Sequence, residues 1–153
     1  MKITFLCTGK TNDKHVAELM KLYKKRLDNY CTLKVVETAD VKSSNAAEAK
    51  KKETLLLKKE IEKADCIALL DVAGTEMTSK QFAAFIQKKQ LASIKHLLFV
   101  IGGAYGFSEE IYTKANDKLS LSQMTFPHQI IRIIFLEQLY RAFTILNNEP
   151  YHH

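Results

Sequence analysis

The stretch His96-Leu-Leu-Phe-Val-Ile-Gly-Gly-Ala-Tyr-Gly-Phe-Ser108 decides the fold class of this chain. Residues 96–101 form a continuous and mostly apolar run, which predicts a strand that other elements cover on both faces. A glycine turn follows, and Ser108 is a suitable N-cap for a short helix that we expect to end near Ala115. A buried strand that passes through a turn into a helix is typical of a parallel α/β sheet.

The same alternation of strands and helices continues on both sides of this stretch. The sequence patterns predict strands at 3–7, 33–37, 66–72 and 118–121, and helices at 13–29, 46–63, 129–146 and after the capping-box pattern that begins at Thr78. We therefore expect an α/β fold with a mostly parallel sheet and helices on both faces. Because no internal repeat, linker or second core is found, we expect one domain over residues 1–153.

The composition favours a cytoplasmic protein that has a polyanionic partner. The chain has 153 residues, 23 of them basic and 17 acidic, and its net charge is +6. Such a charge suits nucleic acid, although many basic proteins bind none. No run approaches the roughly 20 apolar residues of a membrane span, and the start of the chain has too short an apolar run for a signal peptide. Cys7, Cys31 and Cys66 lack metal-ligand spacing, so we expect reduced packing residues and no metal site.

Several familiar catalytic and phosphate-binding motifs are absent. Gly9-Lys10-Thr11 imitates the end of a P-loop, but Thr4 stands where the first glycine of that loop belongs. A dinucleotide-binding turn would need further glycines after the first strand, where only Gly9 occurs. No Ser-His-Asp order, pair of catalytic carboxylates or His/Cys cluster is found. Hydrolytic and metal-dependent chemistry are therefore disfavoured.

Two loops remain at the expected carboxyl ends of the fourth and fifth strands, where open α/β sheets bind their ligands. The glycines of the first loop, Gly102, Gly103 and Gly106, would let a flat adenosine lie against the backbone, or would serve a tight turn with positive φ. The second loop, 122–127, combines polar groups with an apolar pair and a proline. It could form a pocket with the first loop, or it could be only a helix-entry turn.

The last predicted helix has apolar residues all around it, which indicates burial by its own sheet on one side and by a partner subunit on another. We therefore expect a homodimer. Arg132 and Arg141 lie among these apolar residues. They could bind phosphate or carboxylate groups, or they could be paired with Glu137.

Three ordered blocks resemble the RlmH family of bacterial SPOUT enzymes, which methylate N3 of a pseudouridine in 23S ribosomal RNA. The blocks are Leu98-Phe-Val-Ile-Gly-Gly-Ala-Tyr-Gly-Phe107, Leu119-Ser-Leu-Ser-Gln-Met-Thr-Phe-Pro-His128 and Glu137-Gln-Leu-Tyr-Arg-Ala-Phe143, and the terminal Pro150-Tyr-His152 agrees as well. The likeness runs over the whole length of the chain. It implies a deep trefoil knot at the carboxyl end, S-adenosylmethionine as cofactor, and a substrate in the 50S subunit or the assembled 70S ribosome.

The resemblance also implies roles for individual residues. The residues expected to hold S-adenosylmethionine are Leu70, Gly103, Ser122, Gln123, Met124, Thr125, Phe126 and Pro127. The residues expected to face the RNA, to position it or to remove a proton are His128, Arg132, Arg141, Tyr151 and His152, with the tail completing the site of the partner subunit. One departure is His153, which stands where similar proteins carry Arg or Lys and which would make RNA affinity more pH-dependent.

The implied reaction is an in-line transfer of methyl from a sulfonium to a pyrimidine nitrogen, in which alignment of the reactants matters most. His128 or His152 could accept the imino proton, and the sequence does not decide between them. Two alternatives stay open. One is a SPOUT enzyme that methylates transfer RNA or a 2′-hydroxyl, and the other is a ribosome-associated factor that binds S-adenosylmethionine without turnover.

Overall fold

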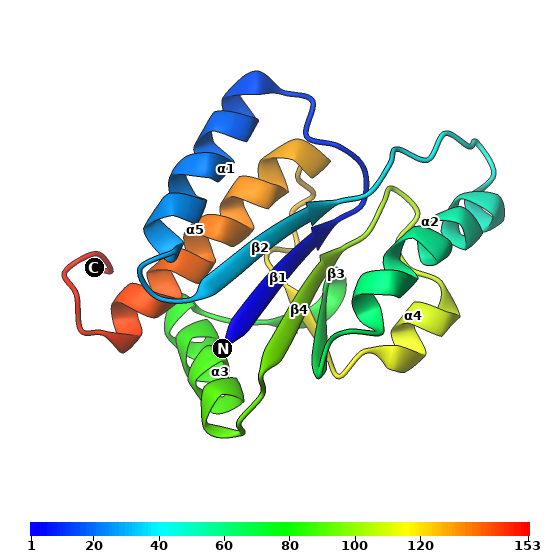
Figure 1. Ribbon diagram of the computed structural model, residues 1–153. Coiled ribbons are helices and arrows are strands. Elements are labelled where there is room, and N and C mark those ends of the chain that lie inside the picture. Colours follow the sequence, from blue (N-terminus) through cyan, green and yellow to red (C-terminus); the bar gives the residue numbers. More distant parts are fainter.

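Five strands and five helices alternate along the chain in the computed structural model, which describes residues 1–153 (Figure 1). The strands are β1 (Lys2–Cys7), β2 (Thr32–Glu37), β3 (Cys66–Glu76), β4 (His96–Ile101) and β5 (Asp117–Ser120). The helices are α1 (Lys14–Leu27), α2 (Ala46–Ile61), α3 (Ser79–Leu91), α4 (Glu109–Lys114) and α5 (His128–Leu146). None of the helices has the length and apolar character needed to cross a membrane.

The strands form one sheet in the order β2-β1-β4-β3-β5, and every neighbouring pair is parallel. Phe5 in β1 pairs with Val35 in β2 and with Phe99 in β4, which places β1 and β4 inside the sheet. Because parallel strands end at the same edge, the turns after β3, β4 and β5 lie near one another. The prediction of a mostly parallel sheet is confirmed.

A hydrophobic core lies on each face of the sheet, because alternate strand residues point to opposite faces. Helices α1, α3 and α5 cover one face, where the ring of Phe135 lies 4.4 Å from that of Phe5 and 4.8 Å from that of Phe99. Helices α2 and α4 cover the other face through Leu57 and Ile111 (Figure 1). The prediction of helices on both faces is confirmed.

One predicted boundary is wrong, because β3 does not end at Val72 but continues to Glu76. After a shift in register, Thr75 pairs with Leu119 of β5, so the extension is held by a strand that comes more than forty residues later. Gly74 lies in this extension, and a Cβ placed there would come within 2.6 Å of the backbone of Leu119. This glycine therefore serves a close approach of two strands. The other predicted boundaries agree with the structure within two residues.

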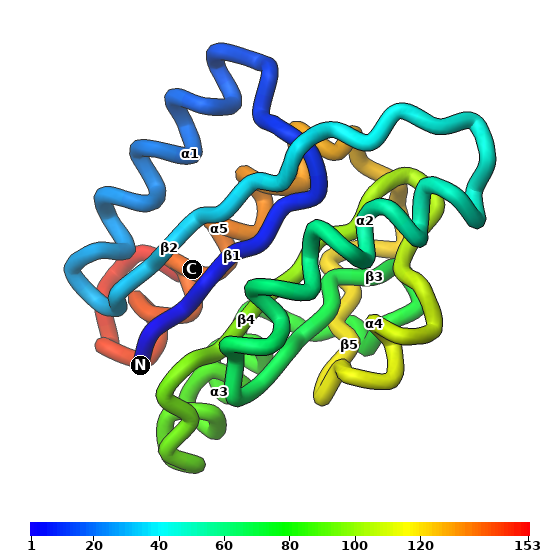
Figure 2. Tube along the Cα trace, turned by 45° about the vertical axis from the view of Figure 1, so that its right-hand side comes forward, coloured from blue at the N-terminus to red at the C-terminus, as the bar shows by residue number.

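The two ends of α5 lie at opposite edges of the sheet. The helix begins beside the carboxyl ends of the strands and runs back toward the edge where the strands begin (Figures 1 and 2). The C-terminal tail stays at that second edge. There the hydroxyl of Tyr30, just before β2, donates to Glu149 at 2.6 Å, and Tyr151 packs on Tyr140 with ring centroids 4.8 Å apart.

Candidate functional site

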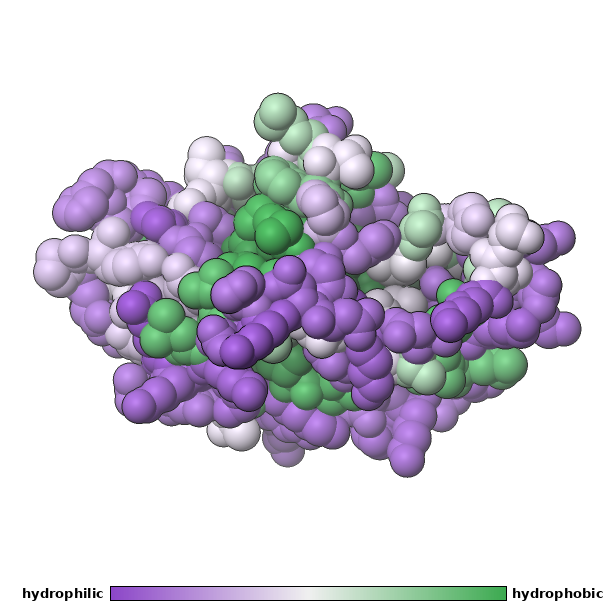
Figure 3. Space-filling model, turned by 90° about the horizontal axis from the view of Figure 1, so that it is seen from above, coloured by the Kyte–Doolittle hydropathy of each residue, from purple (hydrophilic) through white to green (hydrophobic).

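A cavity of about 260 Å³ lies at the carboxyl ends of β3, β4 and β5. The residues that line it are Leu70, Asp71, Val72, Ile101, Gly102, Gly103, Ala104, Gly106, Phe107, Ser120, Leu121, Ser122, Met124, Thr125, Phe126, His128 and Ile131. On the face of the molecule seen from above, apolar residues gather near the middle, and mostly hydrophilic residues surround them (Figure 3). A cavity with apolar walls and a few polar groups is typical of small-molecule sites.

The glycine loop after β4 forms one wall of this cavity. Gly106 has a φ of +72°, and its N–H donates to the carbonyl of Gly103 at 3.1 Å, so this glycine serves the tight turn. Gly102 lies against the ring of Phe107, to which an added Cβ would come as close as 3.1 Å. Gly103 meets the carboxylate of Glu53, since a Cβ there would lie 2.1 Å from Oε1 of that side chain. The tight-turn interpretation is therefore confirmed for Gly106, and the adenosine interpretation of the loop stays a prediction.

The segment after β5 forms the facing wall. Ser120 donates to the carbonyl of Ser122 at 3.2 Å, and the Ser122 hydroxyl accepts from the N–H of Met124 at 2.9 Å. These bonds fold the segment into a tight turn before α5. Of the residues expected to hold the cofactor, the cavity brings together Leu70, Gly103, Ser122, Met124, Thr125 and Phe126. Gln123 and Pro127 belong to the same segment but are not among the lining residues.

Asp71 supplies the only acidic side chain in the lining, and the sequence analysis missed it. It directly follows Leu70 at the edge of the sheet, and its carboxylate accepts from the N–H of Ala73 at 2.9 Å and from the hydroxyl of Tyr112. Burial, followed by this bond and the charge of Asp71, raises the pKa of Tyr112 to about 12. Its position directly after the buried apolar run 66–70 of β3 was the signal that could have identified it.

His128 is the first residue of α5 and lines the cavity. Burial, followed by the positive charge of Arg132, lowers the pKa of its imidazole below 6.5. The ring is therefore mainly neutral at pH 7. A neutral imidazole can accept a proton from a bound substrate.

Arg132 does not face the solvent as expected, because its side chain is only 2% exposed. Its guanidinium donates to Thr11 Oγ1 at 2.7 Å and to the carbonyls of Thr8 at 2.9 Å and Gly9 at 3.1 Å. Its ion-pair partner is Glu37 at the end of β2, at 3.5 Å, rather than Glu137. Arg132 therefore ties α5 to the loop after β1 and is not open to a phosphate group.

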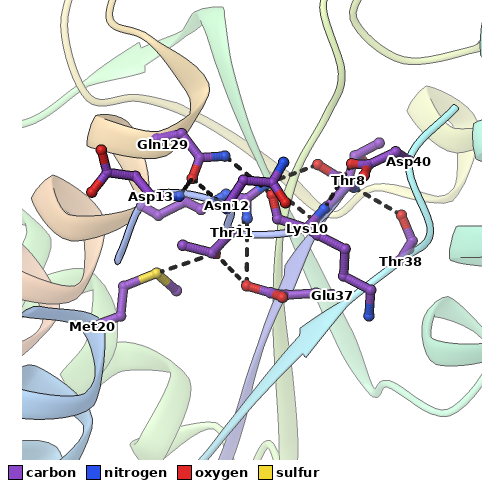
Figure 4. A network of polar contacts seen from close by, with 12 residues as sticks. Thr8, Lys10, Thr11, Asn12, Asp13, Met20, Glu37, Thr38, Asp40 and Gln129 are labelled. Carbon is purple, nitrogen blue, oxygen red and sulfur yellow. Dashed lines mark hydrogen bonds and ion pairs between the residues drawn. The ribbon is translucent and has the colours of Figure 1, made fainter. Parts of the chain in front are cut away.

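Gln129 binds the same loop from the first turn of α5 (Figure 4). Its side-chain oxygen accepts from the N–H groups of Asn12 at 3.0 Å and Asp13 at 3.3 Å, and its amide donates to the carbonyl of Lys10 at 3.1 Å. Figure 4 also shows Thr11 and Glu37 within this network. The start of α5, which carries His128, is thus fixed by contacts to the loop after β1.

The remaining residues expected to face the RNA form a second cluster near the end of α5. Arg141 donates to Glu137 from Nε at 3.0 Å, and its guanidinium lies 4.8 Å from the ring centroid of Tyr151. The hydroxyl of Tyr151 donates to the same Glu137 at 3.2 Å, and Nδ1 of His152 is buried without a partner. Of the two interpretations of Arg141, pairing with Glu137 is the one that the structure shows.

The cavity and this second cluster lie far apart within one chain. His128 and Arg141 are 13 residues apart on one helix, which corresponds to about 20 Å at 1.5 Å per residue. Tyr151 and His152 therefore cannot reach the cavity of their own chain. Their expected role at the site of a partner subunit stays a prediction.

No group of three or more His, Cys, Asp or Glu side chains is arranged to hold a metal ion. All three cysteines are free, and burial raises the pKa of the Cys7 thiol to about 12, which makes it unreactive at neutral pH.

Comparison with known proteins gives matches along the whole chain. A family model described as "Predicted SPOUT methyltransferase" matches residues 1–152. Curated relatives named ribosomal RNA large subunit methyltransferase H are 46% identical in Christiangramia forsetii, 47% in Parabacteroides distasonis and 45% in Bacteroides thetaiotaomicron. Each alignment covers 100% of this chain and 99% of the relative.

A solved structure supports the fold. The crystal structure of TrmJ from Z. mobilis is similar with a TM-score of 0.53, over 100% of this chain and 73% of that chain. Its sequence identity is 14%, so this likeness concerns the arrangement of the strands and helices alone.

Proposed function

The chain belongs to the SPOUT methyltransferase family, and on this basis we propose that it methylates large-subunit ribosomal RNA with S-adenosylmethionine as the methyl donor. The observation that carries the proposal is the cavity at the carboxyl edge of the sheet. Six of the eight residues that the resemblance assigns to the cofactor line this one cavity, although they come from three separate segments of the chain. A pocket assembled in this way is expected for a ligand-binding site of an open α/β sheet.

The chemistry of the cavity fits S-adenosylmethionine. Its apolar walls and the backbone of Gly102 and Gly103, which borders the cavity, suit an adenine ring, and the carboxylate of Asp71 suits a ligand with a cationic sulfonium. When bound, this donor supplies an electrophilic methyl group. The volume of about 260 Å³ lies just below the roughly 300–1,000 Å³ of ordinary ligand sites.

The RNA target is proposed from the relatives and from the charge. The relatives are named for the large-subunit ribosomal RNA, and the net charge of +6 favours a polyanion. The sequence blocks that resemble the RlmH family specify N3 of a pseudouridine in 23S RNA, within the 50S subunit or the 70S ribosome. Such a substrate places the protein in the cytoplasm.

The residues of the chain would orient the pyrimidine, exclude water and hold the proton that leaves the imino nitrogen. His128 is the residue of the cavity that can accept this proton, because burial and Arg132 keep its imidazole neutral near pH 7. Once the imidazole of His128 has taken this proton, the imino nitrogen would have a lone pair free to accept the methyl group that a bound donor would supply. The contacts that fix the start of α5 keep His128 in place for this step.

We propose further that the protein is a homodimer and that its carboxyl-terminal part forms the trefoil knot of the family. The dimer is supported by the position of the tail, since Tyr151 and His152 can complete a cavity only in another chain. The knot is supported by the extension of β3, in which Thr75 and Glu76 pair with Leu119 and Ser120 of β5. The chain segments that a knot must interlace therefore lie in contact.

Ribosomal RNA from cells that lack the protein tests the proposed target. Mass spectrometry of the large-subunit RNA should show the loss of one methylated pseudouridine, and the purified protein with S-adenosylmethionine should restore it on ribosomes. An unchanged RNA would remove this target and would favour transfer RNA or a 2′-hydroxyl. Binding of the donor without any turnover would instead favour the ribosome-associated factor.

Mixed dimers test the shared site. His128→Ala damages the cavity, whereas Tyr151→Ala with His152→Ala damages the tail, and each variant alone should be inactive. If the tail serves the partner subunit, an equal mixture that exchanges subunits should regain about a quarter of the wild-type activity, from the one intact site of each mixed dimer. A mixture as inactive as its components would contradict a shared site.

A further inference from the structure

Glu53 is a buried carboxylate that the proposed mechanism does not use. It lies in α2, a helix rich in lysine, yet its side chain is 8% exposed and it forms no ion pair. Two other glutamates of the same helix differ from it, since Glu48 pairs with Lys52 and Glu60 pairs with Lys63. A buried carboxylate without a cation lowers stability, so its presence calls for another explanation.

The carboxylate of Glu53 packs directly against the glycine loop that lines the cavity. An ideal Cβ at Gly103 would lie 2.1 Å from Oε1 and 2.7 Å from Cδ of Glu53, so only glycine leaves room for this contact. Gly103 also lines the cavity. The same residue therefore contacts Glu53 and borders the space proposed for the methyl donor.

The backbone of Gly103 also influences the ionisation of Glu53. Burial raises the pKa of the Glu53 carboxyl, and the nearby backbone N–H of Gly103 opposes this rise. No side-chain charge contributes to the shift. The carboxylate of Glu53 therefore lies against the backbone of the glycine loop, and no side-chain cation pairs with it.

The next residue of α2 holds the other end of the same loop. The hydroxyls of Thr54 and Ser108 are 2.7 Å apart, and Ser108 is the N-cap of α4, whose Ile111 N–H bonds to its side chain. Thr54 is itself fixed by donating to the carbonyl of Lys50 at 2.7 Å. Two successive residues of α2 thus hold both ends of residues 103–108.

We propose that Glu53 is a positioning residue of the methyl-donor pocket, and that together with Thr54 it holds the glycine loop in the shape that receives the donor. This inference rests on the proposed function. Glu53 acts through the Gly103 backbone and does not touch the donor itself. This role predicts that donor affinity depends more on the side-chain oxygen of Glu53 than on its negative charge, because a backbone N–H needs an acceptor oxygen and not a full charge.

Three variants of α2 test this role. Glu53→Ala removes the acceptor, Glu53→Gln keeps an oxygen without the charge, and Glu62→Ala removes an exposed glutamate next to the end of the same helix. Isothermal titration with S-adenosylmethionine measures donor affinity, and amide hydrogen exchange of Gly103 in the ligand-free protein measures the hold on the loop. Thr54→Val serves as a second loss variant if Glu53→Ala does not fold.

We expect Glu53→Ala to bind the donor roughly 10-fold more weakly, with faster exchange at Gly103, as for the loss of a hydrogen bond to a buried group. Glu53→Gln should stay within about 3-fold of the wild type, and Glu62→Ala should not differ from it. If Glu53→Ala binds the donor as the wild type does, or if Glu53→Gln is as weak as Glu53→Ala, the positioning role is refuted. If the wild-type protein binds no S-adenosylmethionine, the proposed function is refuted instead. Hydrogen exchange at Gly103, compared between the wild type and Glu53→Ala, would still test whether Glu53 holds the glycine loop.

Discussion

Replacing Arg132 by methionine distinguishes a structural clamp from an RNA-facing cation. The buried guanidinium donates to Thr8, Gly9 and Thr11 and pairs with Glu37, so Arg132→Met leaves these acceptors without their donor. We therefore expect a loss of folding stability, in the absence of any RNA. A residue that faced RNA would instead lose RNA affinity and leave the stability almost unchanged.

The magnitude follows from burial. Arg132 is 2% exposed and Glu37 is 25% exposed, and removing one partner of a buried, hydrogen-bonded ion pair costs about 3–5 kcal/mol. For a domain of this size, each kcal/mol lowers Tm by roughly 2–4 °C, so a fall of about 10 °C is expected. The free energies of the several hydrogen bonds of one guanidinium do not add up. The cost of breaking the ion pair is therefore a better estimate of the stability loss than a sum over its hydrogen bonds.

Thermal and urea unfolding at one fixed protein concentration measure the effect, since dimer formation makes Tm depend on concentration. Arg141→Met is the matched control on the same helix. Its ion pair with Glu137 is partly exposed, with side chains 25% and 18% accessible, and such pairs contribute about 1 kcal/mol or less. If Arg132→Met kept its Tm within 2–4 °C of the wild type and lost only RNA methylation, the structural reasoning would be refuted.

Three further predictions concern the pocket and the strands behind it. Gly74→Ala should lower the free energy of unfolding by about 1–3 kcal/mol in urea titrations, because a Cβ meets the backbone of β5; an unchanged midpoint would contradict the close approach. Burial keeps the pKa of Tyr112 raised, but Asp71→Asn should lower it below about 12 in a spectroscopic titration, because the carboxylate disfavours the phenolate, and it should weaken donor binding. The imidazole of His128 should titrate below pH 6.5 by NMR, and Arg132→Met should raise that midpoint because a nearby positive charge is removed. A wild-type midpoint well above pH 7 would remove His128 as a neutral proton acceptor at that pH.

Local patterns in the sequence were sufficient for the elements of the fold. The apolar run 96–101 predicted the bounds of β4, because a strand buried on both faces has no polar side to interrupt it. Thr78 and Gln81 predicted the start of α3 through a capping box that the structure contains. The carboxyl edge of the sheet was predicted as the position of the candidate site for a similar reason, since parallel strands must all end there.

The burial of Glu53 could have been predicted from its spacing in the sequence, although a charged residue is usually expected at the surface. It stands four residues after Ala49 and four before Leu57, which are both buried, so helical spacing places it on the inner face of α2. A glutamate among lysines is more often solvent-exposed, and spacing alone cannot show that a glycine backbone elsewhere leaves room for its carboxylate.

The sequence by itself determined the alternation of strands and helices and their apolar faces, because each of these depends on residues close together in the chain. It also identified the family, through three ordered blocks spread along the chain. Only the tertiary structure decided that Arg132 binds the loop after β1, that Asp71 enters the cavity and that the tail lies about 20 Å from it. Arg132 and Thr11 are separated by 121 positions. The partner of a long polar side chain is set by which elements pack together, and no local pattern records that choice.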